Sequence, residues 1–176
     1  MISNNLPTSL GSAILLFGKF WKPHSARLPS YLHMHNPAIL FPVFALALWT
    51  VLVLMQIPIA RFRSARRREI VADDLKCGES SSVPAHVSIP NRNYMNLLEL
   101  PVLFYVACLL IYTTDVTSPT MIAVAWLYVG LRVVHSLIHL SYNDVLHRLA
   151  AFAASNLVLV VLWILAAIEV FSRPSV

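Results

Sequence analysis

Residues Pro37 to Ala60 read PAILFPVFALALWTVLVLMQIPIA and contain no charged side chain. About 20 apolar residues in a helix cross a bilayer, so this segment is long enough to span a membrane. Three further apolar stretches follow it, and none shows the alternating pattern of a membrane barrel. We therefore predict an all-α integral membrane protein, a bundle of four transmembrane helices at about 37–60, 91–114, 119–141 and 144–171.

The composition favours the same class. Of 176 residues, 58% are hydrophobic and 12% are charged, whereas soluble domains average about 25% charged residues. The mean hydropathy of +0.70 argues against both a disordered chain and a water-soluble enzyme. The net charge of +5 is typical of a membrane protein whose basic residues set the topology of the chain and contact anionic lipid headgroups. We accordingly expect the lipid bilayer, and no nucleic acid, as a partner.

The connections between the spans predict the topology. Only a few residues separate the second span from the third, and the third from the fourth, so neighbouring helices should be antiparallel. The connection 61–90 is long and polar. It carries a basic cluster, Arg61, Arg63, Arg66, Arg67 and Arg68. The positive-inside rule places this connection in the cytoplasm and both chain ends on the opposite side of a cell inner membrane.

Residues 1–33 stand apart from the spans. They carry Lys19, Lys22 and Arg27 without an acidic residue, and their short apolar stretch cannot cross a bilayer. We interpret them as an N-terminal extension, either a disordered or surface-lying tail or a segment that precedes a natural start at Met34. The membrane domain is then 34–176.

Polar residues interrupt the second span. Arg92, Asn96 and Glu99 are spaced i, i+4 and i+7, so one helical face presents a cation, an amide and a carboxylate. Such a face could bind a ligand that itself has ammonium, amide and carboxylate groups. Pro101 leaves the carbonyl of Leu97 without its helical donor, which predicts either a kink or an extra hydrogen-bond acceptor beside this face.

The third and fourth spans add further polar side chains. Four of them share one face of the third span: Tyr128, Arg132, His135 and His139. Arg148 opens the fourth span, so all these groups fall in one leaflet, where we expect Glu99 and Arg132 to pair as part of a ligand site or as a structural salt bridge. No further ligand accompanies His135 and His139 at a suitable spacing, and we predict no metal site.

Two motifs resemble a known family. Arg92-x-x-x-Asn96-x-x-Glu99, followed by Pro101, is similar to the glutathione-binding signature of the membrane-associated proteins in eicosanoid and glutathione metabolism (MAPEG). Arg132-x-x-His135, with Arg148 farther along, resembles the third and fourth helices of the same family. The resemblance runs from about Met34 to the end of the fourth span.

The resemblance implies a homotrimer of four-helix subunits, with glutathione as co-substrate between adjacent subunits near the cytoplasmic side. It assigns Arg148 the catalytic position facing the thiol sulfur. The residues that it implies for glutathione binding are Arg92, Asn96, Glu99, Arg132, His135, His139, and Arg61 or Arg63 at the end of the first helix.

These residues favour thiol chemistry. A cation beside sulfur stabilises the thiolate, which could attack a lipophilic electrophile or hydroperoxide arriving from the membrane. We therefore expect a membrane-bound glutathione transferase or glutathione-dependent peroxidase.

His139 stands where the eicosanoid enzymes often have tyrosine, and Leu149 replaces the serine of prostaglandin E synthase, which disfavours that isomerase. A non-catalytic lipid-binding or scaffold subunit and, more weakly, a small transporter remain as alternatives.

Overall fold

A computed structural model describes residues 35–76 and 78–172, and the predicted extension at 1–33 lies outside these residues. The described part is helical, and it confirms the predicted all-α fold with four helices long and apolar enough to cross a membrane. Its elements are the short 3₁₀ helices η1 (Pro37–Ile39) and η2 (Ala72–Leu75) and the α-helices α2 (Leu40–Arg66), α3 (Ala85–Leu98), α4 (Pro101–Thr113), α5 (Pro119–Leu140) and α6 (Val145–Ser172).

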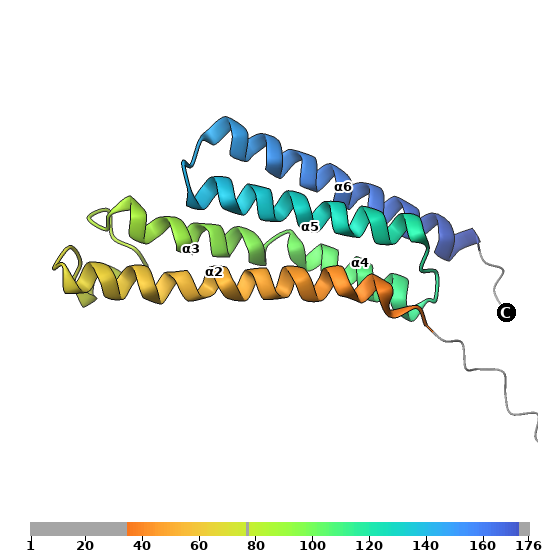
Figure 1. Cartoon of the computed structure of the whole chain (residues 1–176), viewed down its shortest axis with the longest axis horizontal. Helices are drawn as coiled ribbons and strands as arrows, with labels where there is room; N and C mark the ends of the chain where they lie inside the picture. The colour runs from red at the N-terminus through yellow and green to blue at the C-terminus, as the bar shows by residue number, and fades with distance from the viewer. Residues whose placement is uncertain (1–34, 77, 173–176) are drawn as a thin grey trace, which may run out of the picture. The chain divides into compact units, whose positions relative to one another are not determined.

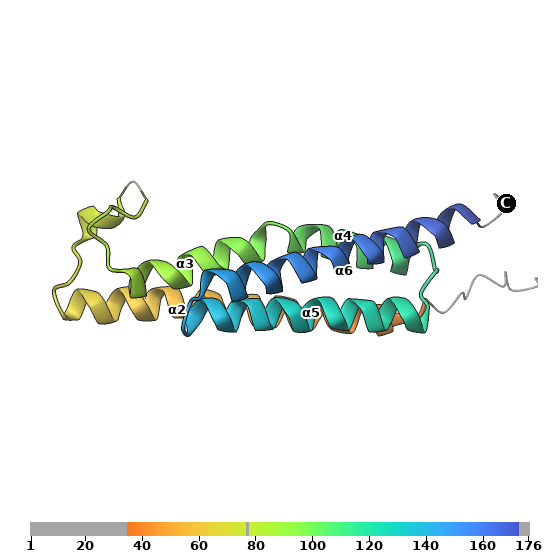
Figure 2. The ribbon, with the colours of Figure 1, turned by 90° about the horizontal axis from the view of Figure 1, so that it is seen from above.

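The helices form an antiparallel bundle in which α3 and α4 together make the second span (Figure 1). The connection 67–84 and the turn 141–144 lie at one end, and the turn 114–118 and both ends of the described chain lie at the other (Figures 1 and 2). The basic connection and the two ends of the described chain thus lie at opposite ends of the bundle, as the predicted topology requires, whereas the chain termini themselves lie outside the described residues.

Two helix boundaries differ from the predicted ones. α2 continues to Arg66 instead of ending near residue 60, because alanine and arginine are good helix formers and the end of an apolar run does not end a helix. α3 starts at Ala85, six residues before the predicted start at 91. Pro90 lies inside this helix. The connection between the first two spans is accordingly shorter than the predicted 61–90.

The predicted kink at Pro101 is confirmed. α3 ends at Leu98, Glu99 has φ −81° and ψ −94°, and a new helix begins at Pro101. Proline has no N–H to donate to the carbonyl of Leu97, so the helical hydrogen-bond ladder stops there. α5 begins as its sequence suggests, because Ser118 Oγ accepts a hydrogen bond from the N–H of Met121 at 3.2 Å and Pro119 occupies the first helical position.

Packing inside the bundle is apolar along most of its length. Leu46, Phe104, Ile111 and Leu162 are fully buried in this core. Large apolar side chains also cover the outside, among them Phe44, Leu127 and Leu157. In a membrane these exposed side chains face lipid tails or other subunits, so the exposed apolar surface agrees with four membrane spans.

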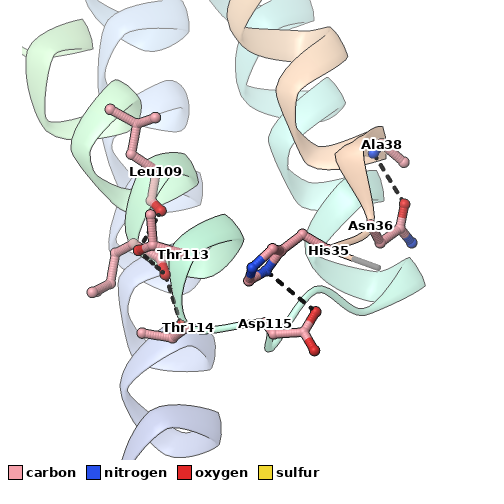
Figure 3. Close-up of polar contacts among 8 residues, drawn as sticks. His35, Asn36, Ala38, Leu109, Thr113, Thr114 and Asp115 are labelled. Atoms are coloured by element: carbon pink, nitrogen blue, oxygen red, sulfur yellow. Dashed lines mark hydrogen bonds and ion pairs between the residues drawn. The ribbon is translucent and has the colours of Figure 1, made fainter. Parts of the chain in front are cut away.

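At the end of the bundle near the described N-terminal residues, His35 bridges two elements (Figure 3). Its Nδ1 lies 3.7 Å from Oδ1 of Asp115, in the turn between α4 and α5. Its ring centroid also lies 5.1 Å from that of Tyr112 of α4, with the two ring planes tilted by 45°. These contacts join the start of the first span to the turn between the second and third.

At the opposite end, His86 joins α3 to the end of α2. Its Nε2 lies 2.9 Å from Ser64 Oγ and 3.0 Å from Glu69 Oε2. The hydrogen bond with Ser64 and the contacts with His86 hold the pKa of the Glu69 carboxyl below its usual range. Because both partners meet the same ring nitrogen, the three residues form a structural clasp and not a serine–histidine–acid relay.

Candidate functional site

A polar hollow of about 560 Å³ opens between α3 and the turn that joins α5 to α6. Seven polar side chains from separate segments lie around it: Ser88, Asn91, Arg92 and Asn96 of α3, His139 of α5, Asn143 of the turn and Arg148 of α6. Its volume falls in the range of small-molecule sites, roughly 300–1,000 Å³. Two arginines and no carboxylate line it, so it favours an anionic ligand.

A second, more apolar hollow of about 240 Å³ adjoins the first. Asn96 and Arg148 line both hollows. The other residues that line the second hollow are His135, Val145, Leu149 and Phe152. The structure thus places Arg148 between a polar compartment and an apolar one.

Several contacts position Arg148. Its Nη1 donates a hydrogen bond of 2.7 Å to Oδ1 of Asn143. Its carbonyl oxygen accepts a hydrogen bond of 3.0 Å from Nδ1 of His135, which therefore carries a proton. Asn143 has a left-handed backbone, with φ +50°, and its N–H donates to the carbonyl of Ile138 at 2.8 Å. The turn and α5 together hold the guanidinium over the hollow.

The start of α6 adds a fixed negative charge near the turn. Oδ1 of Asp144 accepts a hydrogen bond of 2.9 Å from the N–H of His147. That backbone hydrogen bond holds the pKa of the Asp144 carboxyl below its usual range. A carboxylate at this position stabilises the N-terminus of a helix, so Asp144 fixes the first turn that carries Arg148.

Two buried histidines offer unused ring nitrogens beside the hollows. His135 and His139 are each 3% exposed, and their ring centroids are 6.1 Å apart at nearly right angles. His135 Nε2 and His139 Nδ1 have no hydrogen-bond partner within the described chain. Because buried polar atoms are usually paired, these two nitrogens are suited to a polar ligand.

Arg132 lies behind the site and not in its wall. It is fully buried, its Nε donates to the hydroxyl of Tyr128 at 3.1 Å, and its guanidinium carbon lies 5.2 Å from the centre of the Phe152 ring. Its two Nη atoms have no hydrogen-bond partner within the described chain. It does share the inward face of α5 with Tyr128, His135 and His139, as the sequence predicted.

The predicted pair between Glu99 and Arg132 is wrong within a single chain. No ion pair joins them among the described residues, and Glu99 is exposed. The physical reason is the interruption at Pro101. Glu99 follows the last residue of α3 with a non-helical ψ, so the helical spacing does not extend to it, and Arg92 and Asn96 line the hollow without it.

The structure also leaves Arg61 and Arg63 away from this hollow. Arg61 Nη2 lies 3.3 Å from Oε1 of Glu79, in the connection between α2 and α3. Arg63 lines a different depression, on the outer face of α2. Within one chain, then, five of the nine predicted site residues meet around the two adjoining hollows: Arg92, Asn96, His135, His139 and Arg148.

Sequence reasoning missed two supporting contacts. The sequence patterns did not predict that the side chain of Asn143 holds Arg148. Asn93 is fully buried and its Nδ2 donates a hydrogen bond of 2.6 Å to Ser136 Oγ, which joins α3 to α5 behind the site. An asparagine inside a membrane span is itself a signal that it has a partner on another helix.

Comparison with known proteins agrees with the motifs. A model of the MAPEG family matches residues 39–168, which include the four candidate spans almost completely and every residue of both hollows. Neither a curated protein nor a solved structure was found to match the chain. The family match covers most of the sequence, and the four-helix fold agrees with it: the chain belongs to the MAPEG family.

Proposed function

We propose that the protein is a membrane-bound glutathione transferase or glutathione-dependent peroxidase. The observation that supports this most directly is the position of Arg148, which lies between a cationic hollow and a more apolar one. A glutathione-dependent enzyme for lipophilic substrates needs both compartments, one for an anionic peptide and one for an apolar reactant. Family membership supports the same class, because the family includes glutathione transferases and peroxidases as well as non-catalytic members.

In this proposal the polar hollow holds glutathione. Arg92 pairs with a carboxylate of the tripeptide, and the amide of Asn96 bonds its peptide groups. The free ring nitrogens of His135 and His139 accept or donate hydrogen bonds at the edge of the site. Arginine suits the carboxylate contact because its planar guanidinium binds a carboxylate through two parallel hydrogen bonds.

Arg148 acts on sulfur. A free thiol has a pKa near 8.5, and a neighbouring cation lowers it, so the thiolate becomes the prevailing form at neutral pH. In the transferase reaction the thiolate attacks an electrophilic carbon, a carbon–sulfur bond forms and the leaving group departs with its electron pair. In the peroxidase reaction the thiolate attacks a hydroperoxide oxygen, the lipid leaves as an alcohol, and a second glutathione completes the disulfide and releases water.

We further propose that the site is completed in a homotrimer. Glu99, Arg61 and Arg63 lie away from the hollow of their own chain, and Glu99 is exposed. These residues can therefore reach a site that belongs to a neighbouring subunit. We also propose that the basic connection 67–84 faces the cytoplasm of a cell inner membrane, in accordance with the positive-inside rule.

The proposal is tested by glutathione binding and turnover in lipid nanodiscs. Wild-type protein is expected to bind glutathione and conjugate it to a lipophilic nitroaryl halide or reduce a fatty-acid hydroperoxide. Arg92→Gln should raise the KM for glutathione, and Arg148→Gln should lower kcat. Arg68→Gln, which removes the same charge from a residue outside both hollows, should change neither.

The outcomes separate the alternatives. Glutathione binding without turnover of either reactant class would favour a non-catalytic binding subunit. No glutathione binding by the wild-type protein would contradict the proposal and favour a scaffold role. Equal effects of Arg68→Gln and Arg148→Gln would show that only the general positive charge of the protein matters.

A further inference from the structure

The last turns of α2 carry two adjoining depressions that lie apart from the polar hollow of the same chain. One, of about 370 Å³, lies between α2 and the segment 70–75, and its wall is almost entirely apolar. The other, of about 550 Å³, lies on the outer face of α2 and is lined by three apolar residues and three arginines. Pro58 and Phe62 line both depressions, so the two depressions are neighbours on α2.

The basic depression follows from helical spacing. Its lining residues occur in pairs four positions apart, which places them on one face of a helix. They are Pro58, Ile59, Phe62, Arg63, Arg66 and Arg67. Because α2 remains helical to Arg66, this face continues without interruption from the apolar part of the span to the cluster of guanidinium groups.

The apolar depression depends on folding of the connection between α2 and α3. Ile70 is buried with Val83 and Val87 in a small core of its own, with Leu75 packed against it. This core fixes the segment 70–75 beside α2, where Ile70 and Leu75 form part of the wall. The depression is thus built from two ordered segments and is not a gap beside a free loop.

The charges of the basic depression are poorly compensated by the protein. In the described part of the chain, Arg63 and Arg66 form no ion pair. Arg67 Nη1 lies 3.9 Å from Oε1 of Glu69, so one carboxylate lies at the edge of three guanidinium groups. An anion with several oxygen acceptors matches this arrangement.

The apolar residues beside these cations are equally uncovered. Phe62 is 71% exposed and Ile59 is 55% exposed. A soluble anion would satisfy the arginines and leave these side chains in water. A phospholipid would satisfy both, because its headgroup is anionic and its acyl chains are apolar.

We propose that this double depression binds one anionic phospholipid at the edge of the bilayer. Its phosphate and headgroup lie against Arg63, Arg66 and Arg67, its glycerol region lies over Phe62, and an acyl chain occupies the apolar depression. No residue that lines these depressions also lines the polar hollow of the same chain. Arg61 and Arg63 are the two lining residues that the proposed homotrimer would share with the glutathione site of a neighbouring subunit.

Native mass spectrometry with defined lipids tests the proposal. Delipidated protein is offered phosphatidylglycerol or phosphatidylcholine with identical acyl chains, and we expect preferential retention of phosphatidylglycerol. A basic residue at a membrane surface contributes about 1 kcal/mol to anionic lipid binding, or about fivefold. Arg63→Gln with Arg66→Gln should therefore weaken retention by roughly 25-fold, whereas the corresponding pair of lysine substitutions should retain most of it.

A charge-matched control separates a site from a diffuse positive patch. Arg68 belongs to the same basic cluster but lines neither depression, so Arg68→Gln should leave retention nearly unchanged, whereas Arg63→Gln alone should weaken it about fivefold. Phe62→Ser should weaken the binding of both lipids. Circular dichroism checks that each variant retains its helicity and is therefore folded.

Three results would overturn the proposal. Equal retention of the two lipids would exclude recognition of the headgroup. An equal loss for Arg68→Gln and Arg63→Gln would show diffuse attraction only. The third result combines two observations: Ile59→Cys cross-links two chains efficiently in lipid-free protein, and the protein retains no lipid. It would show that a second copy of the chain covers the depressions.

Discussion

The contact between Asn143 and Arg148 provides the sharpest test of how the site is positioned. Asn143→Gly removes the side-chain oxygen that accepts from Arg148 Nη1 at 2.7 Å. Glycine adopts the φ of +50° found at this position without strain. The substitution therefore removes the hydrogen bond and leaves the turn intact.

The expected magnitude follows from the bond. A hydrogen bond to a charged group contributes about 1.5–3 kcal/mol when it is buried. Both residues are only partly buried, so we take about 1 kcal/mol, which corresponds to roughly a fivefold loss of kcat. The KM for glutathione should change little, because Arg92 and Asn96 are untouched. Asn143→Ala should lose the same activity and also about 1–2 kcal/mol of stability, since alanine is strained at positive φ.

The assay is steady-state conjugation of glutathione in nanodiscs, with unfolding measured separately for each variant. Asn143→Asp separates the position of the guanidinium from its charge in the same assay. A carboxylate at the same position holds the guanidinium but offsets its charge, so activity should fall and the rising limb of the pH profile, which follows ionisation of the thiol, should move to higher pH. A wild-type kcat for Asn143→Gly would refute the positioning role of this residue.

Three further predictions concern the fold. The N–H of Val71 and the hydroxyls of Ser82 and Ser80 hold the pKa of Asp74 below its usual range. These contacts therefore stabilise the folded connection above the unfolded pKa of Asp74, and the stabilisation is lost as pH falls through the folded pKa. Hydrogen-exchange protection of this connection should drop in acid, and Asp74→Asn should abolish that pH dependence. Pro101→Ala supplies the missing N–H and should straighten the second span, which would lengthen the distance between spin labels at its two ends; an unchanged distance would show that proline does not cause the interruption. Phe104 is fully buried and its ring stacks on Tyr128 at 4.6 Å. Phe104→Ala should therefore lower the free energy of unfolding by about 3 kcal/mol, measured by reversible unfolding. Leu103→Ala, at a half-exposed site on the same helix, should lower it by less than about 1 kcal/mol.

Much of the fold could be predicted from the sequence because a bilayer imposes strict conditions on a chain. A spanning segment must be apolar, long and helical, so hydropathy alone identified four spans. The cap at Ser118 and the interruption at Pro101 were also predictable, since each depends on the local chemistry of one or two residues. The helix ends near Arg66 and Ala85 were not, because they lie outside the apolar runs that gave the prediction.

The site was predictable only in part. Helical spacing correctly placed Tyr128, Arg132, His135 and His139 on one buried face of α5. Spacing could not show that Arg132 turns toward Phe152, because the rotation of a face depends on packing between helices. It failed for Glu99 for a different reason, since the helix that carries Arg92 ends one residue earlier.

Contacts between distant segments required the structure. The hydrogen bond from Arg148 to Asn143 depends on the left-handed turn between α5 and α6. The apolar depression beside α2 depends on the small core around Ile70, which fixes a connection that the sequence describes only as polar.

The central claim is that Arg148 stabilises the thiolate of bound glutathione, and a pH titration of thiolate ultraviolet absorption tests it most directly. A cation about 4 Å from sulfur contributes about 4 kcal/mol at an effective dielectric constant near 20. Partial exposure of Arg148 reduces this contribution, and we expect about 1–2 pKa units. The thiol should therefore titrate about 1–2 units below its free value in the wild type and near its free value in Arg148→Gln, with Arg148→Lys between them. An identical titration curve for wild type and Arg148→Gln would contradict the account.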